Sequence, residues 1–551
     1  MKMKALKPFA SLLILSPLMF IVCAGNNTRD NSPVDDILSS LTLEQKIGQM
    51  IMPAVPGKKM TPQLKSILKK YQPGGIIFFG YNLGSPDEVK EFTSSIQEYS
   101  VECSGMPVLI SIDQEGGRVK RLTEGVTQFP GNMAAGAAFD KNLAYLWGRI
   151  LGLELRSLGV NMNLTPALDI NDNPENPVIN TRSFGADIET VSVMGRAYIK
   201  GQQESRCISV GKHFPGLGNS SVDTHLKLTV IDFDMERLED VELKPFGDAI
   251  NDGLECIMTT HSAFPKILQN RDSATISPFF LTEVLREKMK FKGLIITDDM
   301  EMGAITKEFM IGDAAVKSVA AGADIILLST SGPSIEKIYT SLISAVKDGR
   351  ISSKRVDDSA RRILETKWKY GILSYDENKK IAPPKFSLTD DEKEILKKGR
   401  EVNSELSKKS ISYRGSAAHL QPDKETVRVF VSNTPAFTNN LSLNKNDMKA
   451  ADFDSAITLI NKLPKNAKCV LYVYSYTSQP SYFGNILSVC QKRDIPLVAA
   501  VSGDPFPLMR SGAYDTLVMS FSNTAASLEF LAKACSGVFA PQLDTKLLPA
   551  K

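Results

Sequence analysis

The sequence predicts an α/β protein made of an eight-stranded (β/α)8 barrel of the TIM type, followed by a smaller, layered α/β domain. Two observations predict the barrel. Short apolar runs recur between Ile51 and Ser329 with segments of helical length between them, and polar residues end several of these runs. A third observation predicts the second domain: a polar stretch follows the barrel, and further apolar runs follow that stretch.

We expect eight parallel strands in the first part of the chain, near residues 51–52, 75–79, 108–113, 161–169, 208–213, 255–261, 294–298 and 324–328. In a barrel of this kind the carboxyl ends of the strands meet at one mouth, where functional side chains gather. The polar residues that end the runs would therefore surround one opening: Asp113, Asp169, Lys212, His213, His261 and Asp298. A doubly wound open sheet would also bind ligands at its strand ends, so the predicted cleft does not depend on closure of the barrel.

The chain divides into four segments. Residues 1–24 read as a signal peptide, because basic residues precede an apolar run at 9–22 that is too short to span a membrane. Two processing routes stay open: cleavage after small residues, or attachment of a lipid to Cys23. The barrel is expected over 25–371, a linker over 372–395, and the α/β domain over 396–551, with strands near 427–431, 469–474, 497–501 and 516–521. We expect an exported protein, periplasmic or at the cell surface, which contacts the membrane only through such a lipid.

The amino-acid composition narrows the range of possible functions. The 551 residues include 65 basic and 62 acidic residues, a net charge of +3, with no long basic run, so nucleic acid is not an expected partner. The seven cysteines show no C-x-x-C spacing and mostly lie beside apolar residues, which favours free thiols over a metal site or a disulfide framework. Nothing in the sequence indicates the oligomeric state.

The most informative segment is 212–225, K-H-F-P-G-L-G-N-S-S-V-D-T-H, which places an ammonium group, two imidazoles and a carboxylate on one expected loop. Asp223 and His225 are two residues apart, so their side chains can turn toward one cleft and form a hydrogen bond. A carboxylate partner favours the protonated imidazole and fixes its orientation, which suits a general acid. The alternative is a surface pair of no functional consequence.

This string resembles the signature of the bacterial β-N-acetylglucosaminidases (β-hexosaminidases) of glycoside hydrolase family 3. Three further segments are similar to family motifs: D-Q-E-G-G-R-V at 113–119, N-T-R-S-F-G at 180–185, and the strand that ends at Asp298. The resemblance covers about 41–373 and implies that Asp298 is the nucleophile and that His225, supported by Asp223, is the acid/base. It also implies that substrate hydroxyl and acetamido groups are bound by Asp113, Arg182, Lys212 and His213.

Several nearby residues are expected to support the site or the loops around it. Asp299 is expected to cap the following helix or to support Asp298, and Glu115 and Arg118 are expected to stabilise a local turn. His261 could contact substrate or be structural, and Arg121 is left unassigned. Leu217 stands where many family members have histidine, so the geometry of the loop could differ here.

The resemblance implies an enzyme: an exo-acting, retaining β-N-acetylglucosaminidase that removes terminal N-acetylglucosamine from peptidoglycan fragments or chitooligosaccharides through a covalent glycosyl-aspartate intermediate. It implies no metal and no organic cofactor. Three alternatives stay open: a phosphorylase of the same family, a surface glycan-binding protein without catalysis, and a β-glucosidase. The last is disfavoured, because such relatives usually take their acid/base glutamate from the second domain.

Overall fold

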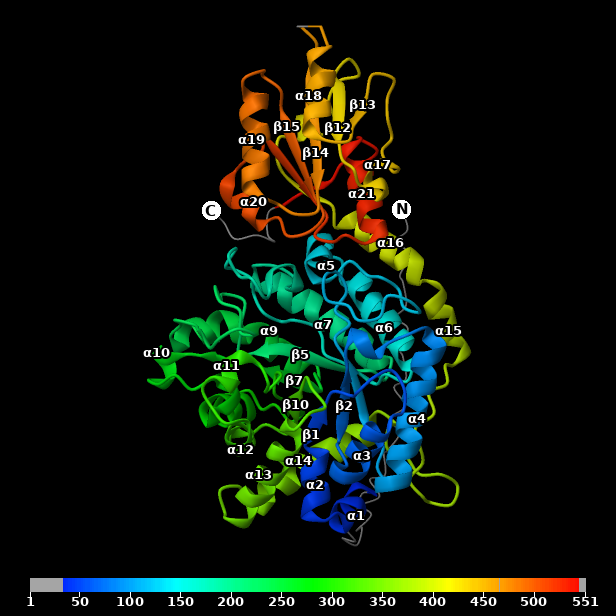
Figure 1. The fold of residues 1–551 in the computed structure, drawn as a ribbon, viewed down its shortest axis with the longest axis vertical. Helices are drawn as coiled ribbons and strands as arrows, with labels where there is room; N and C mark the ends of the chain where they lie inside the picture. Colours follow the sequence, from blue (N-terminus) through cyan, green and yellow to red (C-terminus); the bar gives the residue numbers. More distant parts are fainter. Residues whose placement is uncertain (1–32, 465, 545–551) are drawn as a thin grey trace, which may run out of the picture.

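A computed structural model describes residues 33–464 and 466–544 of the chain (Figure 1). The expected signal peptide, including Cys23, lies outside these residues. No helix within the two described ranges is long and apolar enough to cross a membrane.

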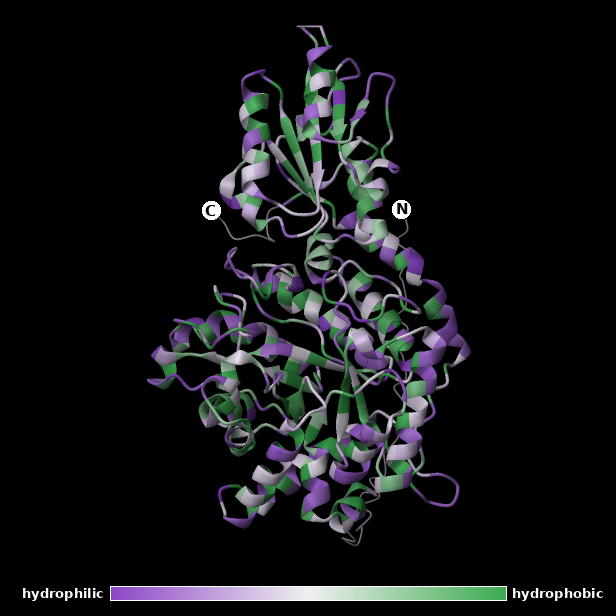
Figure 2. Cartoon of the chain, in the orientation of Figure 1, coloured by the Kyte–Doolittle hydropathy of each residue, from purple (hydrophilic) through white to green (hydrophobic). Residues whose placement is uncertain are grey.

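The first part of the chain is built on a curled, parallel six-stranded sheet whose strands follow chain order. Its members are β2 (Gly75–Phe78), β3 (Leu109–Ile112), β4 (Met162–Asn163), β5 (Ile208–Phe214), β7 (Cys256–Thr259) and β9 (Leu294–Ile296). All of their residues are buried, as expected of parallel strands covered on both faces. Figure 2 shows these strands as hydrophobic and the surrounding helices as mixed.

Two more parallel strands, β1 (Ile51–Pro53) and β10 (Ile326–Leu328), pair with each other. Single bridges lie on either side of this pair, between Ala54 and Ile77 at β2 and between Ile296 and Ile325 at β9. Each of the eight expected runs therefore contains one strand. The ladders divide these strands into a sheet of six and a sheet of two.

The strand β4 is much shorter than the expected 161–169. Pro166 has no N–H to donate to a neighbouring strand, so the ladder stops before it. Pairing with β5 resumes only as a single bridge between Ala167 and Lys212. Asp169 consequently lies in a loop beyond the strand.

Helices cover the outside of the sheet (Figure 1). They include α1 (Pro33–Ser40), α2 (Leu43–Gln49), α3 (Pro62–Tyr71), α4 (Pro86–Ser104), α5 (Asn132–Ala138), α6 (Lys141–Ser157), α7 (Ile188–Glu204), α9 (Leu243–Asn251), α11 (Gly303–Thr306), α12 (Ile311–Ala321), α13 (Ser334–Lys347) and α14 (Ser353–Lys369). The ends of α4 show how the sequence sets their length. Ser85 and Glu88 form a capping box at its start, and Gly105, at φ 71°, ends it in the left-handed conformation that glycine favours.

The second part of the chain contains a seven-stranded sheet in the order β13-β12-β14-β15-β16-β11-β17. Its strands are β11 (Ser412–Gly415), β12 (Val427–Val431), β13 (Met448–Ala450), β14 (Cys469–Ser475), β15 (Leu497–Val501), β16 (Thr516–Met519) and β17 (Gln542–Leu543), and only β11 runs antiparallel to its neighbour β16. The four strands expected from the sequence are β12, β14, β15 and β16. The helices α18 (Phe453–Asn461), α19 (Pro480–Gln491), α20 (Phe506–Ser511) and α21 (Ala525–Cys535) pack on this sheet, and α15 (Asp390–Lys397) and α16 (Gly399–Lys409) lead into it.

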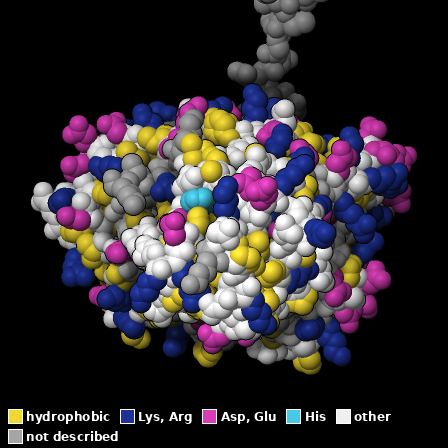
Figure 3. Space-filling model, turned by 90° about the horizontal axis from the view of Figure 1, so that it is seen from above, with side chains coloured by type: hydrophobic (Ala, Val, Ile, Leu, Met, Phe, Trp, Pro, Cys, Tyr) yellow, Lys and Arg dark blue, Asp and Glu magenta, His cyan; other side chains and the backbone are white. Residues whose placement is uncertain are grey.

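The distribution of charged side chains on the surface agrees with the nearly equal numbers of basic and acidic residues. Figure 3, seen from the end that carries the second sheet, shows basic and acidic side chains mixed over this face. The six described cysteines are free, and all but the half-buried Cys103 are buried.

Candidate active site

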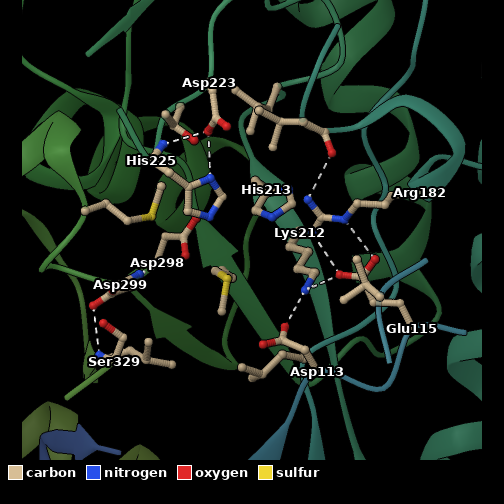
Figure 4. A pocket seen from close by; sticks show the side chains of 18 of the residues that line it. Asp113, Glu115, Arg182, Lys212, His213, Asp223, His225, Asp298, Asp299 and Ser329 are labelled. Carbon is tan, nitrogen blue, oxygen red and sulfur yellow. Dashed lines mark hydrogen bonds and ion pairs between the residues drawn. The ribbon is translucent and has the colours of Figure 1, made fainter. Parts of the chain in front are cut away.

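A cavity of about 450 Å³ opens where the strands β3, β5 and β9 end (Figure 4). It is lined by every residue that the sequence proposed for catalysis or binding: Asp113, Arg182, Lys212, His213, Asp223, His225 and Asp298. The two segments proposed for catalysis, one after β5 and one after β9, therefore face the same space. No group of three or more His, Cys, Asp or Glu side chains in the described ranges is placed to hold a metal ion.

One side of the cavity is a network of buried charges centred on Lys212. Its ammonium group lies 2.8 Å from Asp113 Oδ1 and 2.7 Å from Glu115 Oε1. Burial lowers the pKa of Lys212, but the two carboxylates more than offset this and raise it. Lys212 is therefore a fixed positive charge at the wall of the cavity.

Glu115 continues this network to Arg182. Its two carboxylate oxygens accept hydrogen bonds from Arg182 Nε at 2.9 Å and Nη2 at 2.8 Å, a bidentate pair. Burial raises the pKa of Glu115, but the charges of Arg182 and Lys212 outweigh it and hold the pKa well below its usual range. Glu115 is thus a buried anion that orients two cations. The local turn predicted for it is also present, because its N–H donates to the Val119 carbonyl at 3.0 Å.

The other side of the cavity carries Asp298 just beyond β9. Burial raises the pKa of this carboxyl. His213, the Asp299 N–H and Lys212 lower the pKa by more than burial raises it, so the net shift is downward. The Asp299 N–H donates to Asp298 Oδ1 at 2.8 Å and fixes the carboxylate. Asp298 is therefore ionised at neutral pH.

Asp299 connects strand ends and does not cap a helix. Its Oδ1 accepts hydrogen bonds from the Glu301 N–H at 3.0 Å and from the Ser329 N–H at 2.9 Å, and Ser329 follows β10. Of the two roles predicted for Asp299, the helix cap is wrong, because the N-cap of α11 is Met302.

His261 lies behind the wall of the cavity. Burial lowers its pKa, so the ring is neutral near pH 7. Its Nε2–H donates to the Asp299 carbonyl at 2.9 Å, which leaves Nδ1 to accept from the Thr275 hydroxyl at 2.8 Å. With both nitrogens engaged, His261 has a structural role here, one of the two left open by the sequence.

Asp223 and His225 form the hydrogen-bonded pair that their spacing predicts. The ring Nδ1 lies 2.7 Å from Asp223 Oδ1, which also accepts the His225 backbone N–H at 2.8 Å. Burial raises the pKa of Asp223, but these bonds and the charge of His225 lower it overall. The His225 side chain lines the cavity and is 64% exposed, and within the described ranges no side chain or backbone group is hydrogen-bonded to its Nε2.

His213 is held by Asp169, a loop residue that does not line the cavity. Asp169 lies 2.8 Å from His213 Nδ1 and also accepts the Leu217 N–H at 2.7 Å. A carboxylate only accepts, so Nδ1–H is the donor, and Nε2 is the ring nitrogen without a bond to Asp169. Leu217, the position that departs from the family pattern, is buried and lines the cavity.

Two arginines extend the rim. Arg121 lies 3.6 Å from Asp113, and Arg118 lines both this cavity and a smaller one of about 130 Å³ against the second sheet. The smaller cavity is bordered by loops that follow β14, β15 and β16, including Tyr476 and Asp504. Arg118 therefore lies at the junction of both parts of the chain, a wider role than the local bridge expected from sequence.

Comparison with known proteins places this site in a family. The model of the glycosyl hydrolase family 3 N terminal domain matches residues 42–366, which hold all the site residues. The chain belongs to glycosyl hydrolase family 3.

Individual family 3 relatives support this assignment. A β-hexosaminidase A of Pseudoalteromonas piscicida is 32% identical over 332 residues, 56% of this chain and 56% of that protein, so the match spans little more than half of its length. A β-hexosaminidase of Nitrosomonas eutropha is 34% identical over 291 residues, 51% of this chain and 82% of the relative.

A solved structure resembles both parts of this family 3 chain. It is a family 3 β-N-acetylglucosaminidase from a Paenibacillus species, with a TM-score of 0.78 and 32% identity, and the match covers 93% of this chain and 99% of that one. The second, seven-stranded sheet is therefore part of an arrangement that this relative shares.

Proposed function

We propose that this protein is an exo-acting, retaining β-N-acetylglucosaminidase that releases terminal N-acetylglucosamine from peptidoglycan fragments or chitooligosaccharides. One observation carries the proposal: an ionised Asp298 and the Asp223–His225 pair come from different loops and line one cavity. The similar relatives named β-hexosaminidase and β-N-acetylglucosaminidase support the choice of sugar.

In the first step an Asp298 oxygen bonds to the anomeric carbon while the bond to the leaving oxygen breaks. The His225 imidazolium gives its proton to that oxygen, and Asp223 stabilises the charged ring beforehand. In the second step neutral His225 takes a proton from water. The water oxygen bonds to the anomeric carbon, the glycosyl ester breaks, and Asp298 is regenerated. Two inversions give net retention of configuration.

The charged network gives a physical basis for binding the sugar. The structure shows partners for two of the three ammonium protons of Lys212, which leaves one for a sugar hydroxyl. Asp113 accepts hydrogen bonds from hydroxyls, and His213, which lines the cavity, offers Nε2 as a further hydrogen-bonding group. Arg182, held by Glu115, presents its remaining N–H groups at a fixed angle to the acetamido-bearing sugar.

We further propose that the eight parallel strands close into one (β/α)8 barrel. The bridges from Ala54 to Ile77 and from Ile296 to Ile325 lie at the two seams where β1 and β10 meet the six-stranded sheet. At the seam between β9 and β10, the Thr297 N–H donates to the Ile325 carbonyl at 3.0 Å. Just before β1 and β2, the Gly74 N–H donates to the Gly48 carbonyl at 3.0 Å, and both bonds support closure. An experimental structure with β1 and β10 packed away from β2 and β9 would contradict it.

The activity is tested with 4-nitrophenyl β-N-acetylglucosaminide. We expect Asp298→Ala to lower kcat by about 10³-fold or more and His225→Ala to lower it by about 10²-fold or more. Asp252→Ala, at an exposed site away from the cavity, is the control. Near-normal rates in Asp298→Ala would refute the mechanism. Release of the sugar 1-phosphate in phosphate buffer would identify a phosphorylase instead, and tight binding of the sugar without turnover would identify a glycan-binding protein.

Export is also proposed, on the basis of residues 1–24 alone. Cell fractionation of the wild type and Cys23→Ala distinguishes the two routes. A lipid-anchored protein moves from the membrane to the soluble fraction in the variant, whereas a protein cleaved by the other route is soluble in both.

A further inference from the structure

The loop that carries His225 rests on the segment that follows Asp298. The Gly303 N–H donates to the His225 carbonyl at 3.1 Å, and Lys307 Nζ donates to the Leu226 carbonyl at 2.7 Å. His225, Leu226 and Lys227 at the tip of this loop are exposed, Leu226 by 65%, whereas Thr224 is buried. Two backbone carbonyls of the tip are therefore bound by one short segment, which begins five residues after Asp298.

The shape of this contact requires glycine at position 303. A Cβ added there would lie 2.7 Å from the Leu226 carbonyl oxygen and 2.8 Å from the His225 carbonyl oxygen. The φ of Gly303 lies outside the left-handed region, so the backbone itself would accept alanine. Gly303 is also the first residue of α11, where alanine is the better helix former. A methyl group at this position would therefore displace the loop.

The segment 299–303 is itself fixed to the end of β10. Asp299 Oδ1 accepts the N–H groups of Glu301 and Ser329. The Glu301 carboxylate accepts the Thr330 N–H at 2.8 Å and the Ser334 hydroxyl at 2.6 Å. A loop bound to this segment thus has a defined position relative to Asp298.

The base of the loop is held from another side. Asn176 Nδ2 donates to the carbonyls of Leu217 and Gly218, both at 2.8 Å, and Asn173 Nδ2 donates to the Asn219 carbonyl at 3.0 Å. Loss of the Gly303 contact would therefore leave the base in place and release the tip.

We propose that Gly303 and Lys307 are positioning residues, which bind the tip of the loop at 223–227 to the segment after β9 and so fix the separation between His225 and Asp298. The proposal rests on the roles assigned to these two residues under the proposed function. In this arrangement α11 aligns the acid with the nucleophile.

The test compares leaving groups of different acidity. Hydrolysis of a phenyl β-N-acetylglucosaminide needs a proton from the acid, whereas 2,4-dinitrophenolate departs without one. We expect Gly303→Ala to lower kcat/KM for the phenyl substrate by about 10-fold or more and for the dinitrophenyl substrate by less than about 3-fold, since general acid catalysis contributes about 10² to 10⁴. Lys307→Met should show the same selectivity with a smaller loss.

Two matched variants separate positioning from general damage. Gly332→Ala also adds a methyl group after β10 but meets only an ordinary contact at 3.5 Å, and Lys292→Met removes an exposed ammonium at the opposite end of β9. Both should leave both rates unchanged. Equal losses on the two substrates in Gly303→Ala, or no loss, would overturn the proposal.

A second measurement does not depend on activity. Amide deuterium uptake in peptides that cover 221–230 should be faster in Gly303→Ala than in the wild type, while uptake in 170–180 stays the same. If the wild type cleaves neither glycoside, the proposed function fails, yet faster uptake would still support the docking. Unchanged uptake in 221–230 would overturn the docking itself.

Discussion

At the scale of single residues, Glu115 is the position whose loss should have the widest effect. Glu115→Gln keeps the size of the side chain but removes the charge that pairs with Lys212 and Arg182. Leaving buried cations without their partner costs about 3 to 5 kcal/mol. We expect the free energy of unfolding to fall by about that amount and KM to rise, as measured by chemical denaturation and by initial rates.

The exposed Glu308→Gln is the matched control and should change the free energy of unfolding by no more than about 0.5 kcal/mol. A loss below about 1 kcal/mol in Glu115→Gln would show that solvent or Asp113 compensates for the missing charge.

The site residues differ in how far the sequence could predict them. Asp298 and His213 stand at the ends of apolar runs, so strand geometry alone places them at a mouth. For Glu115 the sequence predicts only the local turn, because its partner Arg182 is 67 residues away in the chain and a D-Q-E-G-G turn gives no sign of that contact. The Gly116–Gly117 turn, with φ values of 81° and 56°, explains the local pattern but not the buried charge.

The helix α14 lies at the end of the molecule opposite the cavity and carries a buried lysine. Lys367 Nζ donates to Gln49 Oε1 at 2.6 Å and to the Pro107 carbonyl at 2.8 Å, both of them neutral acceptors. Burial lowers the pKa of Lys367 from 10.5 to about 7. Between these values the folded state binds fewer protons than the unfolded state, so stability rises as pH rises.

Lys367→Met should remove this dependence. The shift corresponds to as much as about 5 kcal/mol, gained by the wild type between about pH 7 and pH 10.5 and absent in the variant. Urea denaturation of both proteins at about pH 7 and about pH 9.5 measures the difference. Equal gains in the two proteins would mean that Lys367 stays charged in the fold.

The elements themselves were predictable where apolar runs are continuous. The strands β12, β14, β15 and β16 occupy the expected runs, whereas β11, with the sequence S-Y-R-G, carries no apolar pattern and was missed. It exists because β16 offers an antiparallel edge, a tertiary effect that a local pattern cannot show. The expected linker at 372–395 contains the start of α15, where Thr389 and Glu392 form a capping box.

At the scale of the whole molecule, α5 joins the two parts of the chain. It follows the D-Q-E-G-G motif in sequence, yet Met133, Ala134 and Ala137 belong to the apolar core beneath the second sheet. Figure 1 shows α5 at the junction between the two parts. Asn180 Nδ2 adds a hydrogen bond to Asp504 Oδ2 at 2.8 Å close to the cavity. The run N-M-A-A-G-A-A is too short and too evenly apolar for a sequence pattern to show which core it joins.

This shared core predicts that the two parts unfold together. Met133 is fully buried, so Met133→Lys places a charge in an apolar interior, which a protein tolerates only with a partner. We expect the free energy of unfolding to fall by more than about 3 kcal/mol, and calorimetry should show the part of the chain with the seven-stranded sheet melting first as a separate transition. Met310→Lys, at a methionine that is 72% exposed, is the matched control and should melt as the wild type does. Because loops of the seven-stranded sheet border Arg118 beside the active-site cavity, the same variant should also lose activity at temperatures between its two transitions. A single transition at the wild-type temperature would show that α5 is dispensable to the junction.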